Sequence, residues 1–474
     1  MITPKDSSIS TQEHIETINA DIEKTLAEIN QLVGTPRVVR NAKELAALER
    51  EMSQLTNRLS SLLLAQKLQQ SLDSVELKED ASSCVKSQPK RYKNQGRREV
   101  TIRTVHGETI VVKTSYFSRA GVKRKKNRRG FYPGLIVLGI HDHCTPECAS
   151  EISKLAVILS SYEEARHVLA DRGMDIGVNT IRMISQRYAQ RARVAQRRTI
   201  SGCRMSVAGC RVVISTDGGR LRIRKNKPGA KTKKGRTRYS TTWREPKLLI
   251  ISVVNLRGEL VRRVTPFIDG TLKGPDAVFG LLRYYLGTLN IHLAAKVVFV
   301  ADGARWMWNR VQTLLVSLGL KPTQFFELID FYHAAQHVGN VATLRKGWNA
   351  SQRKRWFKTY RKLLLGGKVD AVIQAIREVC RGRNSKKLRR ERDYFERNRQ
   401  RMAYKKVSEI GLPIGSGAME SAIRRVINLR LKGASMYWHR DTAEAMILLR
   451  SYYKAGRWDT LKKLAFSVPT IETA

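Results

Sequence analysis

The stretches VVISTDGGR at residues 212–220 and VVFVADGAR at residues 297–305 decide the fold that this sequence predicts. Each begins as a run of β-branched and apolar residues, which is typical of a strand buried on both faces. Each then ends in Asp-Gly, with an arginine three residues after the aspartate. We therefore expect two equivalent strands that carry Asp217 and Asp302 at their ends.

The segments around this pair complete an α/β domain. Between the two Asp-Gly strands, the sequence predicts strands at 248–255 and 260–267 and then a helix at 275–289. After the second Asp-Gly strand it predicts a helix at 310–318 and a strand at 325–329. The order β-β-β-α-β-α-β is the ribonuclease H-like layout, in which the first and fourth strands lie side by side and parallel. Asp217 and Asp302 are then expected to emerge together at one edge of the sheet.

The chain is strongly basic. It has 474 residues, with 88 Lys and Arg against 41 Asp and Glu and a formal net charge of +47. Residues 1–80 hold nine Lys and Arg and thirteen Asp and Glu, so the remaining 394 residues carry +51. Such a surface repels itself unless a polyanion neutralises it, and a nucleic acid, DNA or RNA, is the partner that we expect. A merely soluble basic protein and a binder of anionic membranes are the alternatives.

Composition also bounds the compartment. No apolar run approaches the ~18 residues that a spanning helix needs, and the first ten residues lack the apolar segment of a signal peptide. Six cysteines in this length do not make a disulfide framework. We expect a cytoplasmic protein with no membrane partner.

The two aspartates suggest metal chemistry. Two unpaired carboxylates forced together repel, so one takes a proton or a divalent cation lies between them. With a polyanionic substrate, Mg²⁺ or Mn²⁺ is the expected cation. Either Asp-Gly alone is explained as a turn after a strand; the pair on matching strands favours the metal site. Glu420, in the segment LPIGSGAMES at 412–421, offers a third carboxylate, although a first-turn glutamate also stabilises a helix dipole.

These motifs together resemble those of DDE-type bacterial insertion-sequence transposases, in the broad Mutator-like group. The matching segments are STDGG at 215–219, VADGA at 300–304, DFYH at 330–333 and IGSGAMES at 414–421, within about residues 207–450. The resemblance implies a catalytic and metal-binding triad of Asp217, Asp302 and Glu420. It also implies an Asp-x-x-His pair, Asp330 and His333, which we expect to support the metal ligands from behind. A bacterial, nucleoid-associated protein is implied as well, with double-stranded DNA as partner, both the terminal inverted repeats of the element and the target DNA.

The N-terminal third is expected to hold no chemistry but to bind DNA. Residues 1–83 predict two helices, the second with a heptad seam from Leu45 to Leu62, which either fold back on each other or pair with another chain in a homo-oligomer. Residues 84–200 predict a basic linker to Arg98, a β-hairpin turning at His106-Gly107, and a helix-turn-helix. Its second helix, from about Asn179, should present Arg182, Arg187 and Arg191 to a major groove. The alternative is that the two helices form an ordinary helical hairpin.

The catalytic domain is expected over 207–455, with an all-helical insertion at about 338–406 and a tail at 456–474. Residues 353–406 hold twenty Lys and Arg against five acids, which predicts a face lying on DNA. Trp348, Trp356 and Tyr360 are expected to pack the insertion, with base stacking as the alternative, and core packing is expected for Trp438. The basic loop at 123–129, the basic segment 222–238 and the C-terminal helix supply further residues for phosphates. The individual DNA-binding candidates there are Arg220, Arg224, Lys225, Lys233, Lys234, Arg424, Arg430 and Lys432.

A histidine and cysteine cluster reads H-x-H-C-x3-C at His141, His143, Cys144 and Cys148. Structural zinc sites usually have two well-separated ligand pairs, and Cys203 and Cys210 are too far apart to supply the second. We expect no structural zinc here, and the sequence leaves open whether the cluster binds a metal.

The sequence therefore predicts a DNA transposase that cuts DNA at the ends of its element and joins the freed 3′-hydroxyl to target DNA. Two alternatives remain. One is a transposase-derived DNA-binding protein without catalysis, against which the presence of all three acids speaks. The other is a ribonuclease H-like nuclease without strand transfer.

Overall fold

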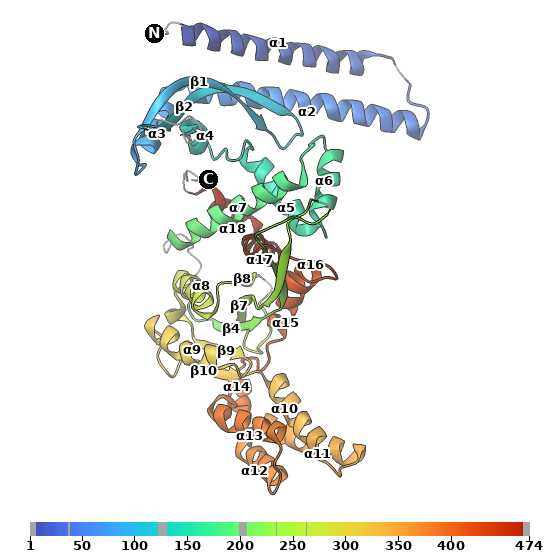
Figure 1. Cartoon of the computed structure of the whole chain (residues 1–474), viewed down its shortest axis with the longest axis vertical. Helices are drawn as coiled ribbons and strands as arrows, with labels where there is room; N and C mark the ends of the chain where they lie inside the picture. The colour runs from blue at the N-terminus through green and yellow to red at the C-terminus, as the bar shows by residue number, and fades with distance from the viewer. Residues whose placement is uncertain are drawn as a thin grey trace. The chain divides into compact units, whose positions relative to one another are not determined.

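The computed structural model describes residues 6–36, 38–121, 130–198, 206–233, 235–261 and 263–467. The chain forms two compact units, the first made of residues 1–195 and 462–474 and the second of residues 196–461 (Figure 1). Three features singled out in the sequence lie outside the described residues: the basic segment at 123–129, Cys203 and Lys234.

The N-terminal helices of the first unit fold back on each other. Helix α1 (Asp6–Gly34) is followed by α2 (Ala42–Asp73) and α3 (Val75–Lys86). Helices α1 and α2 pack together, and Gln66 of α2 donates a hydrogen bond to Asn19 of α1 at 2.7 Å. Of the two arrangements that the sequence left open, the intramolecular hairpin is therefore present.

The buried residues of α2 lie in the second half of the helix. Leu45, at the start of the seam, is 48% exposed, whereas Ser61, Ala65, Gln69 and Leu72 are buried. The reason is that the second half of α2 packs on the β-hairpin, where Gln69 bonds both backbone groups of Lys113 at 2.7 and 3.0 Å.

The predicted β-hairpin is confirmed. Strands β1 (Tyr92–Arg103) and β2 (Thr109–Arg119) pair antiparallel with Ile102 opposite Ile110, and β3 (Gly130–Phe131) adds to β2. The expected basic linker to Arg98 is wrong at its end, because the strand already begins at Tyr92. Arg97 pairs with Asp73 at 2.5 Å and Arg98 lies 4.1 Å from the centroid of the Tyr116 ring, so both charges are accommodated on the strand.

The helix-turn-helix segment has the predicted helices. Helices α4 (Pro133–Val137) and α5 (Pro146–Ile158) precede α6 (Tyr162–Asp171), whose N-cap Ser161 accepts from the backbone of Glu164 at 3.0 Å. Helix α7 (Val178–Arg198) buries Ile181, Ile184 and Tyr188, as the pattern predicted. The segment expected as a C-terminal tail from residue 456 instead contains α18 (Trp458–Phe466). The ring of Phe466 packs edge-on against that of Tyr188, with 5.6 Å between the ring centroids.

A five-stranded mixed sheet forms the centre of the second unit, so the chain is of the mixed α/β class. The sheet order is β10-β9-β4-β7-β8, in which β4 and β9 pair parallel, as predicted, while β7 runs antiparallel to β4. The strands are β4 (Arg211–Gly218), β7 (Lys247–Val254), β8 (Phe267–Thr271), β9 (Lys296–Ala301) and β10 (Phe325–Ile329).

The third strand was misplaced by the sequence reading. We expected it at 260–267, but β8 occupies 267–271 and Leu260 forms only an isolated bridge with Val254. Leu260 is 55% exposed, whereas Phe267 and Ile268 are buried. The alternation before Phe267 therefore marks a surface turn and not the edge of the sheet.

Helices cover the sheet and complete one continuous core. Helix α8 packs on β7 and β8, α17 on β8, α9 on β10, and α15 on β4 and β7. Helix α15 continues through a π-helical turn, η4 (Arg424–Asn428), into α16 (Leu429–Leu431). The bounds of the covering helices are α8 (Pro275–Thr288), η2 (Ile291–Leu293), α9 (Arg305–Ser317), α15 (Gly417–Ile423) and α17 (Arg440–Lys454).

The segment expected as an insertion is helical. Its buried residues join the same core cluster as the sheet, and Trp348, Trp356 and Tyr360 pack half-buried against it. The helices are α10 (Phe331–Leu344), α11 (Ala350–Leu365), α12 (Val369–Cys380), α13 (Lys386–Asn398), η3 (Arg399–Arg401) and α14 (Tyr404–Glu409).

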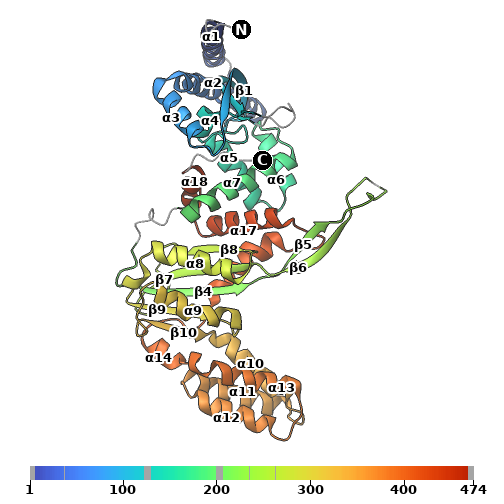
Figure 2. The ribbon, with the colours of Figure 1, turned by 60° about the vertical axis from the view of Figure 1, so that its left-hand side comes forward.

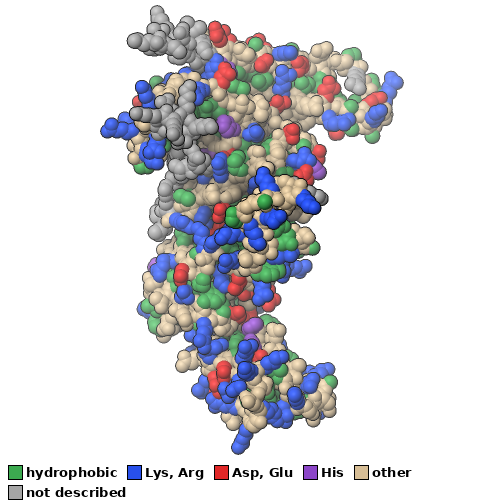
Figure 3. Space-filling view, in the orientation of Figure 1, with side chains coloured by type: hydrophobic (Ala, Val, Ile, Leu, Met, Phe, Trp, Pro, Cys, Tyr) green, Lys and Arg blue, Asp and Glu red, His purple; other side chains and the backbone are tan. Residues whose placement is uncertain are grey.

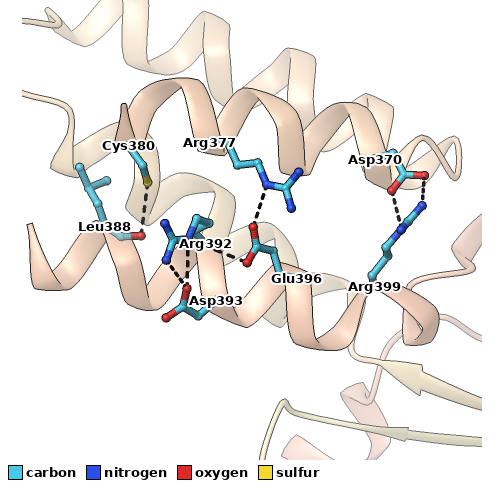
Figure 4. A network of polar contacts seen from close by, with 8 residues as sticks. All are labelled: Asp370, Arg377, Cys380, Leu388, Arg392, Asp393, Glu396 and Arg399. Atoms are coloured by element: carbon cyan, nitrogen blue, oxygen red, sulfur yellow. Dashed lines mark hydrogen bonds and ion pairs between the residues drawn. The ribbon is translucent and has the colours of Figure 1, made fainter. Parts of the chain in front are cut away.

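Polar contacts join α12 to α13 (Figure 4). Arg377 donates to Glu396 at 2.8 Å, and Arg399 pairs with Asp370 at 2.6 Å. Exposed pairs of this kind contribute ~0–1 kcal/mol each, so the apolar face of α12 stabilises the pair more than they do. Their main effect is to engage Asp370 and Glu396, two of the five acids in this basic segment.

Two further features bear on function. A two-stranded ribbon, β5 (Leu221–Asn226) with β6 (Tyr239–Arg244), projects beyond the five-stranded sheet (Figure 2). Across the described ranges, no helix has both the length and the apolar character needed to cross a membrane.

Candidate active site and nucleic-acid contacts

Asp217 and Asp302 lie level with each other on adjacent strands. Strands β4 and β9 pair in a register that ends with Ser215 opposite Val300. Continuing that register by two residues sets Asp217 opposite Asp302, as the repeated motif predicted. Local turns hold both side chains, since Asp217 Oδ1 accepts from the backbone of Gly218 at 2.6 Å and Asp302 Oδ1 from that of Ala304 at 2.9 Å.

The electrostatics of the pair are those of two crowded acids. Burial is the main cause that raises the pKa of Asp217 to about 6; the negative charges of Asp302 and Glu245 contribute to the increase, and the backbone hydrogen bond of Gly218 opposes it. Such a shift at a strand end is characteristic of sites that hold a proton or a cation.

Asp217→Asn is therefore expected to stabilise the metal-free protein at pH 8 but not at pH 4. The folded pKa lies above the unfolded value, so the stability that this carboxyl contributes is present below about pH 4 and is lost as the pH rises through 6. Asparagine does not ionise and avoids that loss. Thermal melts in EDTA between pH 4 and 8 measure the difference from the unmodified chain. Asp276→Asn, at an exposed side chain, is the control, and equal melting of the Asp217 variant and the parent at pH 8 would contradict the assignment.

Glu245 is a nearby acid that the sequence reading missed. It lies just before β7, where Lys247 pairs with Gly218, and a side-chain atom of Glu245 occupies the space beside Gly218. Its carboxylate is 2.6 Å from Lys247 Nζ, and that ammonium lies 4.4 Å from the centroid of the Trp306 ring. The available signal was its position two residues before a strand that pairs with the strand of Asp217.

Glu420 is placed on the expected helix but not with the two aspartates. It lies in the first turn of α15, which packs on β4 and β7, and it is exposed. Glu420 is not among the charges that shift Asp217. Within the described ranges, no three His, Cys, Asp or Glu side chains lie close enough together to hold a metal ion. The structure thus brings two members of the expected triad together and leaves the third apart.

Asp330 links the loop of Glu420 to the sheet. It is buried at the end of β10, where Oδ1 accepts from the backbone of His333 at 2.8 Å. Its Oδ2 accepts from Ser416 N at 2.5 Å and from Ser416 Oγ at 2.6 Å. Since Ser416 is the N-cap of α15, Asp330 fixes the start of the helix that carries Glu420.

Asp330→Ala is expected to destabilise the second unit by about 3 kcal/mol or more. The change removes three hydrogen bonds, and each buried donor left unsatisfied costs ~1–3 kcal/mol. Urea unfolding of the full chain measures it. Ser416→Ala is the matched control, because it removes only the hydroxyl bond and should cost about 1 kcal/mol. An Asp330→Ala chain no less stable than the control would show that the loop is held by other contacts.

His333 belongs to a cluster that the sequence reading did not foresee. His337 Nδ1 lies 2.5 Å from a Glu391 carboxylate oxygen, and its Nε2 lies 3.3 Å from His333 Nε2. With Nδ1–H of His337 donated to Glu391, the network assigns the proton between the rings to His333. The His337 ring stacks on Tyr394 at 3.8 Å. Burial raises the pKa of Tyr394, and the charges of Asp302 and Asp330 add to the increase, so the cluster borders the aspartate pair.

The expected DNA-binding side chains of the second unit divide by exposure. Arg220, Lys225, Lys233, Arg424 and Lys432 are exposed, in agreement with the prediction, and Arg224 is half-buried. The expected exposure of Arg430 is wrong: it is 5% exposed and its guanidinium lies 5.3 Å from the ring centroid of the buried Trp438. Lys and Arg side chains are dense over α11–α13 on the face shown in Figure 3.

Two arginines of the predicted recognition helix are engaged within the first unit. Arg191 is 4% exposed and lies 3.3 Å from Asp142, and Arg187 pairs with the same carboxylate. The prediction that Arg191 faces a DNA groove is therefore wrong, and that for Arg187 is weakened. Asp142 has a positive φ of 54° in the loop before α5, a position that helical periodicity does not reveal. Arg182 is half-buried.

Three residues of the histidine and cysteine cluster, His141, Cys144 and Cys148, are buried in the first unit, whereas His143 is exposed. Cys144 and Cys148 are buried thiols, and the hydrogen bond between them, together with burial, raises the pKa of Cys148. Burial lowers the pKa of His141 to about 4, with a further contribution from Arg191. His143 Nδ1 lies 3.0 Å from the carbonyl oxygen of Thr101. These contacts give each group a structural role.

Comparison with protein-family models, curated proteins and solved structures finds no match to this chain.

Proposed function

We propose that this chain is a DNA transposase of the DDE type whose second unit has a ribonuclease H-like fold. The observation that carries the proposal is the level placement of Asp217 and Asp302 on the parallel strands β4 and β9, with the raised pKa of Asp217. The sheet order and the helical segment at 338–406 agree with the layout that the sequence resemblance implies. The net charge of +47 supports DNA as substrate.

The residues fit a divalent cation in part. Asp217 and Asp302 supply hard oxygen ligands of the kind that Mg²⁺ and Mn²⁺ prefer. The hydroxyl of Tyr394, which is buried near Asp302, has no hydrogen-bond partner among the described residues. Glu420 and Glu245 are the two candidates for a third ligand.

When bound, the cation supplies charge neutralisation and an activated oxygen nucleophile for phosphodiester cleavage. The protein side chains position that chemistry. Asp217, Asp302 and the third acid would hold the cation that neutralises the scissile phosphate. Asp330 fixes the start of the helix that carries Glu420. The hydrogen bonds from Glu391 through His337 to His333 give His333 a defined proton position near the two aspartates. Water attack releases a 3′-hydroxyl, and that hydroxyl then attacks a target phosphodiester and displaces its 3′-oxygen.

The test uses the full chain and DNA from either side of its gene. Inverted repeats bounded by short direct duplications define the ends, and a labelled duplex carrying one end is incubated with a supercoiled plasmid in Mg²⁺ or in EDTA. We expect Mg²⁺-dependent nicking at the end and labelled plasmid products. Tight binding without nicking would favour a non-catalytic DNA-binding protein. Nicking without joined product would favour a nuclease.

A further inference from the structure

The ribbon β5–β6 is a direct extension of the strands that border Asp217. Only Gly219 and Arg220 separate β4 from β5, and only Glu245 and Pro246 separate β6 from β7. Since β4 and β7 are themselves paired, the ribbon continues their pairing past the sheet edge at which Asp217 lies. Whatever binds the ribbon is therefore held close to the candidate active site.

One face of the ribbon carries aromatic rings interleaved with arginines. Side chains alternate along a strand, and the register pairs Arg222 with Trp243 and Arg224 with Thr241, so these share a face with Tyr239. Trp243 is 56% exposed and Tyr239 is 43% exposed. The opposite face is buried through Leu221 and Ile223.

The arginines of this face are committed to the rings. The Arg222 guanidinium lies 5.4 Å from the Trp243 ring centroid and 4.9 Å from that of Tyr437, and Arg224 lies 5.8 Å from that of Tyr239. Arg222 also donates to the carbonyl of Gly433 at 2.8 Å. These contacts fix the planes of the rings and leave the outer face of Trp243 to solvent.

The base of the ribbon is fixed to the rest of the second unit. The backbone of Arg224 donates to Trp438 O at 2.9 Å, and that of Trp438 donates to Arg222 O at 3.0 Å. Trp438 is buried and its indole donates to Leu431 O at 3.0 Å. The exposed rings are thus presented by a fixed support.

Charge identifies the partner as nucleic acid. Residues 219–244 contain eleven Lys and Arg and no acid. The described lysines and arginines beyond the aromatic face are exposed: Lys225, Lys227, Lys231, Lys233, Arg236 and Arg238. A polyanion with flat π-surfaces is complementary to a basic ribbon with exposed rings. Bases inside a duplex are stacked on each other, so the ring of Trp243 is available only to an unpaired base.

The position of Trp243 sets where that base lies. Arg222, which pairs with Trp243, is five residues beyond Asp217. At ~3.3 Å per strand residue, the distance from Asp217 to Arg222 is at most about 17 Å. That distance equals about five steps of 3.4 Å along a DNA strand. The unpaired base would lie within about five nucleotides of the phosphate to be cut.

We propose that the Trp243 face of the ribbon stacks an unpaired DNA base beside the scissile phosphate and so recognises opened rather than fully paired DNA. The inference rests on the proposed function for the identity of the site, but its test does not require cleavage. Stacking on an aromatic side chain changes affinity by about 5- to 100-fold per base.

The experiment compares two probes of one sequence: a fully paired 30-base-pair duplex and the same duplex with five unpaired nucleotides at one end. Fluorescence anisotropy with the full chain should show tighter binding to the forked probe, and Trp243→Ala should remove about 5-fold or more of that preference without weakening duplex binding. Trp243→Phe should restore it. Lys233→Ala is the charge control and should weaken both probes alike. Because Trp243 is exposed, its variants should melt at the parental temperature.

Two results would overturn the inference. The first is that Trp243→Ala keeps its preference for the forked probe. The second is that light scattering shows a changed oligomeric state of Trp243→Ala while DNA binding is intact, which would make this face a contact between protein chains. Asp217→Asn should keep the preference. A chain that prefers forked DNA but never cuts in Mg²⁺ would contradict the proposed function and leave this inference standing.

Discussion

Asp217→Asn and Asp302→Asn are each expected to lower Mg²⁺-dependent cleavage of end DNA by at least about 10²- to 10³-fold while leaving duplex affinity within about twofold. Loss of one oxygen ligand removes several kcal/mol of transition-state stabilisation. Affinity depends on Lys and Arg contacts to phosphate, which these carboxylates do not make. Single-turnover cleavage and anisotropy titrations on one end duplex measure the two quantities.

The same assay assigns the third acid. The family resemblance points to Glu420, whereas Glu245 is the acid whose charge acts on Asp217. Glu420→Gln and Glu245→Gln should therefore be compared directly, with Asp276→Asn as an exposed control in the same unit. Normal cleavage by Glu420→Gln and loss in Glu245→Gln would move the triad to the acid before β7. Full activity in both aspartate variants would refute the active site altogether.

Asp142→Asn is expected to destabilise the first unit by about 3–5 kcal/mol, the largest stability effect predicted here. Its carboxylate side chain is 1% exposed and pairs with Arg187 and with Arg191, which is 3% exposed. Removing one partner leaves a buried charge uncompensated. Asparagine tolerates the positive φ at this position, so the effect reports the charge and not the backbone. Urea unfolding of the full chain, followed by circular dichroism, should show an earlier first transition.

Arg182→Ala is the matched variant on the same helix. It should unfold like the parent, yet weaken binding to end DNA relative to scrambled DNA by about 1–3 kcal/mol if the helix reads bases. Equal weakening on both DNAs would make the helix a phosphate contact. Unchanged stability of Asp142→Asn would show that the arginines are held by other groups.

The sequence predicted the features of this chain that depend on local patterns. The repeat of a β-branched run ending in Asp-Gly, together with the order of the surrounding strands and helices, predicted that β4 and β9 pair parallel with Asp217 and Asp302 level. Hydrophobic spacing likewise foresaw the buried face of α7 and the helical character of 338–406.

What the sequence did not reveal depends on pairing between distant segments. Nothing local marks Glu245, which reaches Asp217 only because β7 pairs with β4. The burial of Arg191 depends on Asp142, 49 residues away. The seam from Leu45 to Leu62 indicated a helix correctly, but the residues that α2 buries are set by the hairpin beneath its other half.

The C-terminal residues have a consequence for synthesis of the protein. Residues 462–474 belong to the first unit, where Phe466 covers Tyr188 and approaches the position of Gly139, and Lys462 bonds Glu147. The first unit is therefore incomplete until residues 462–466 have been translated. A chain released early on the ribosome, for example by a stop codon before residue 458, would carry an intact sheet with its aspartate pair but an unfinished N-terminal unit. Truncation before residue 458 is thus expected to act as a folding defect of the first unit.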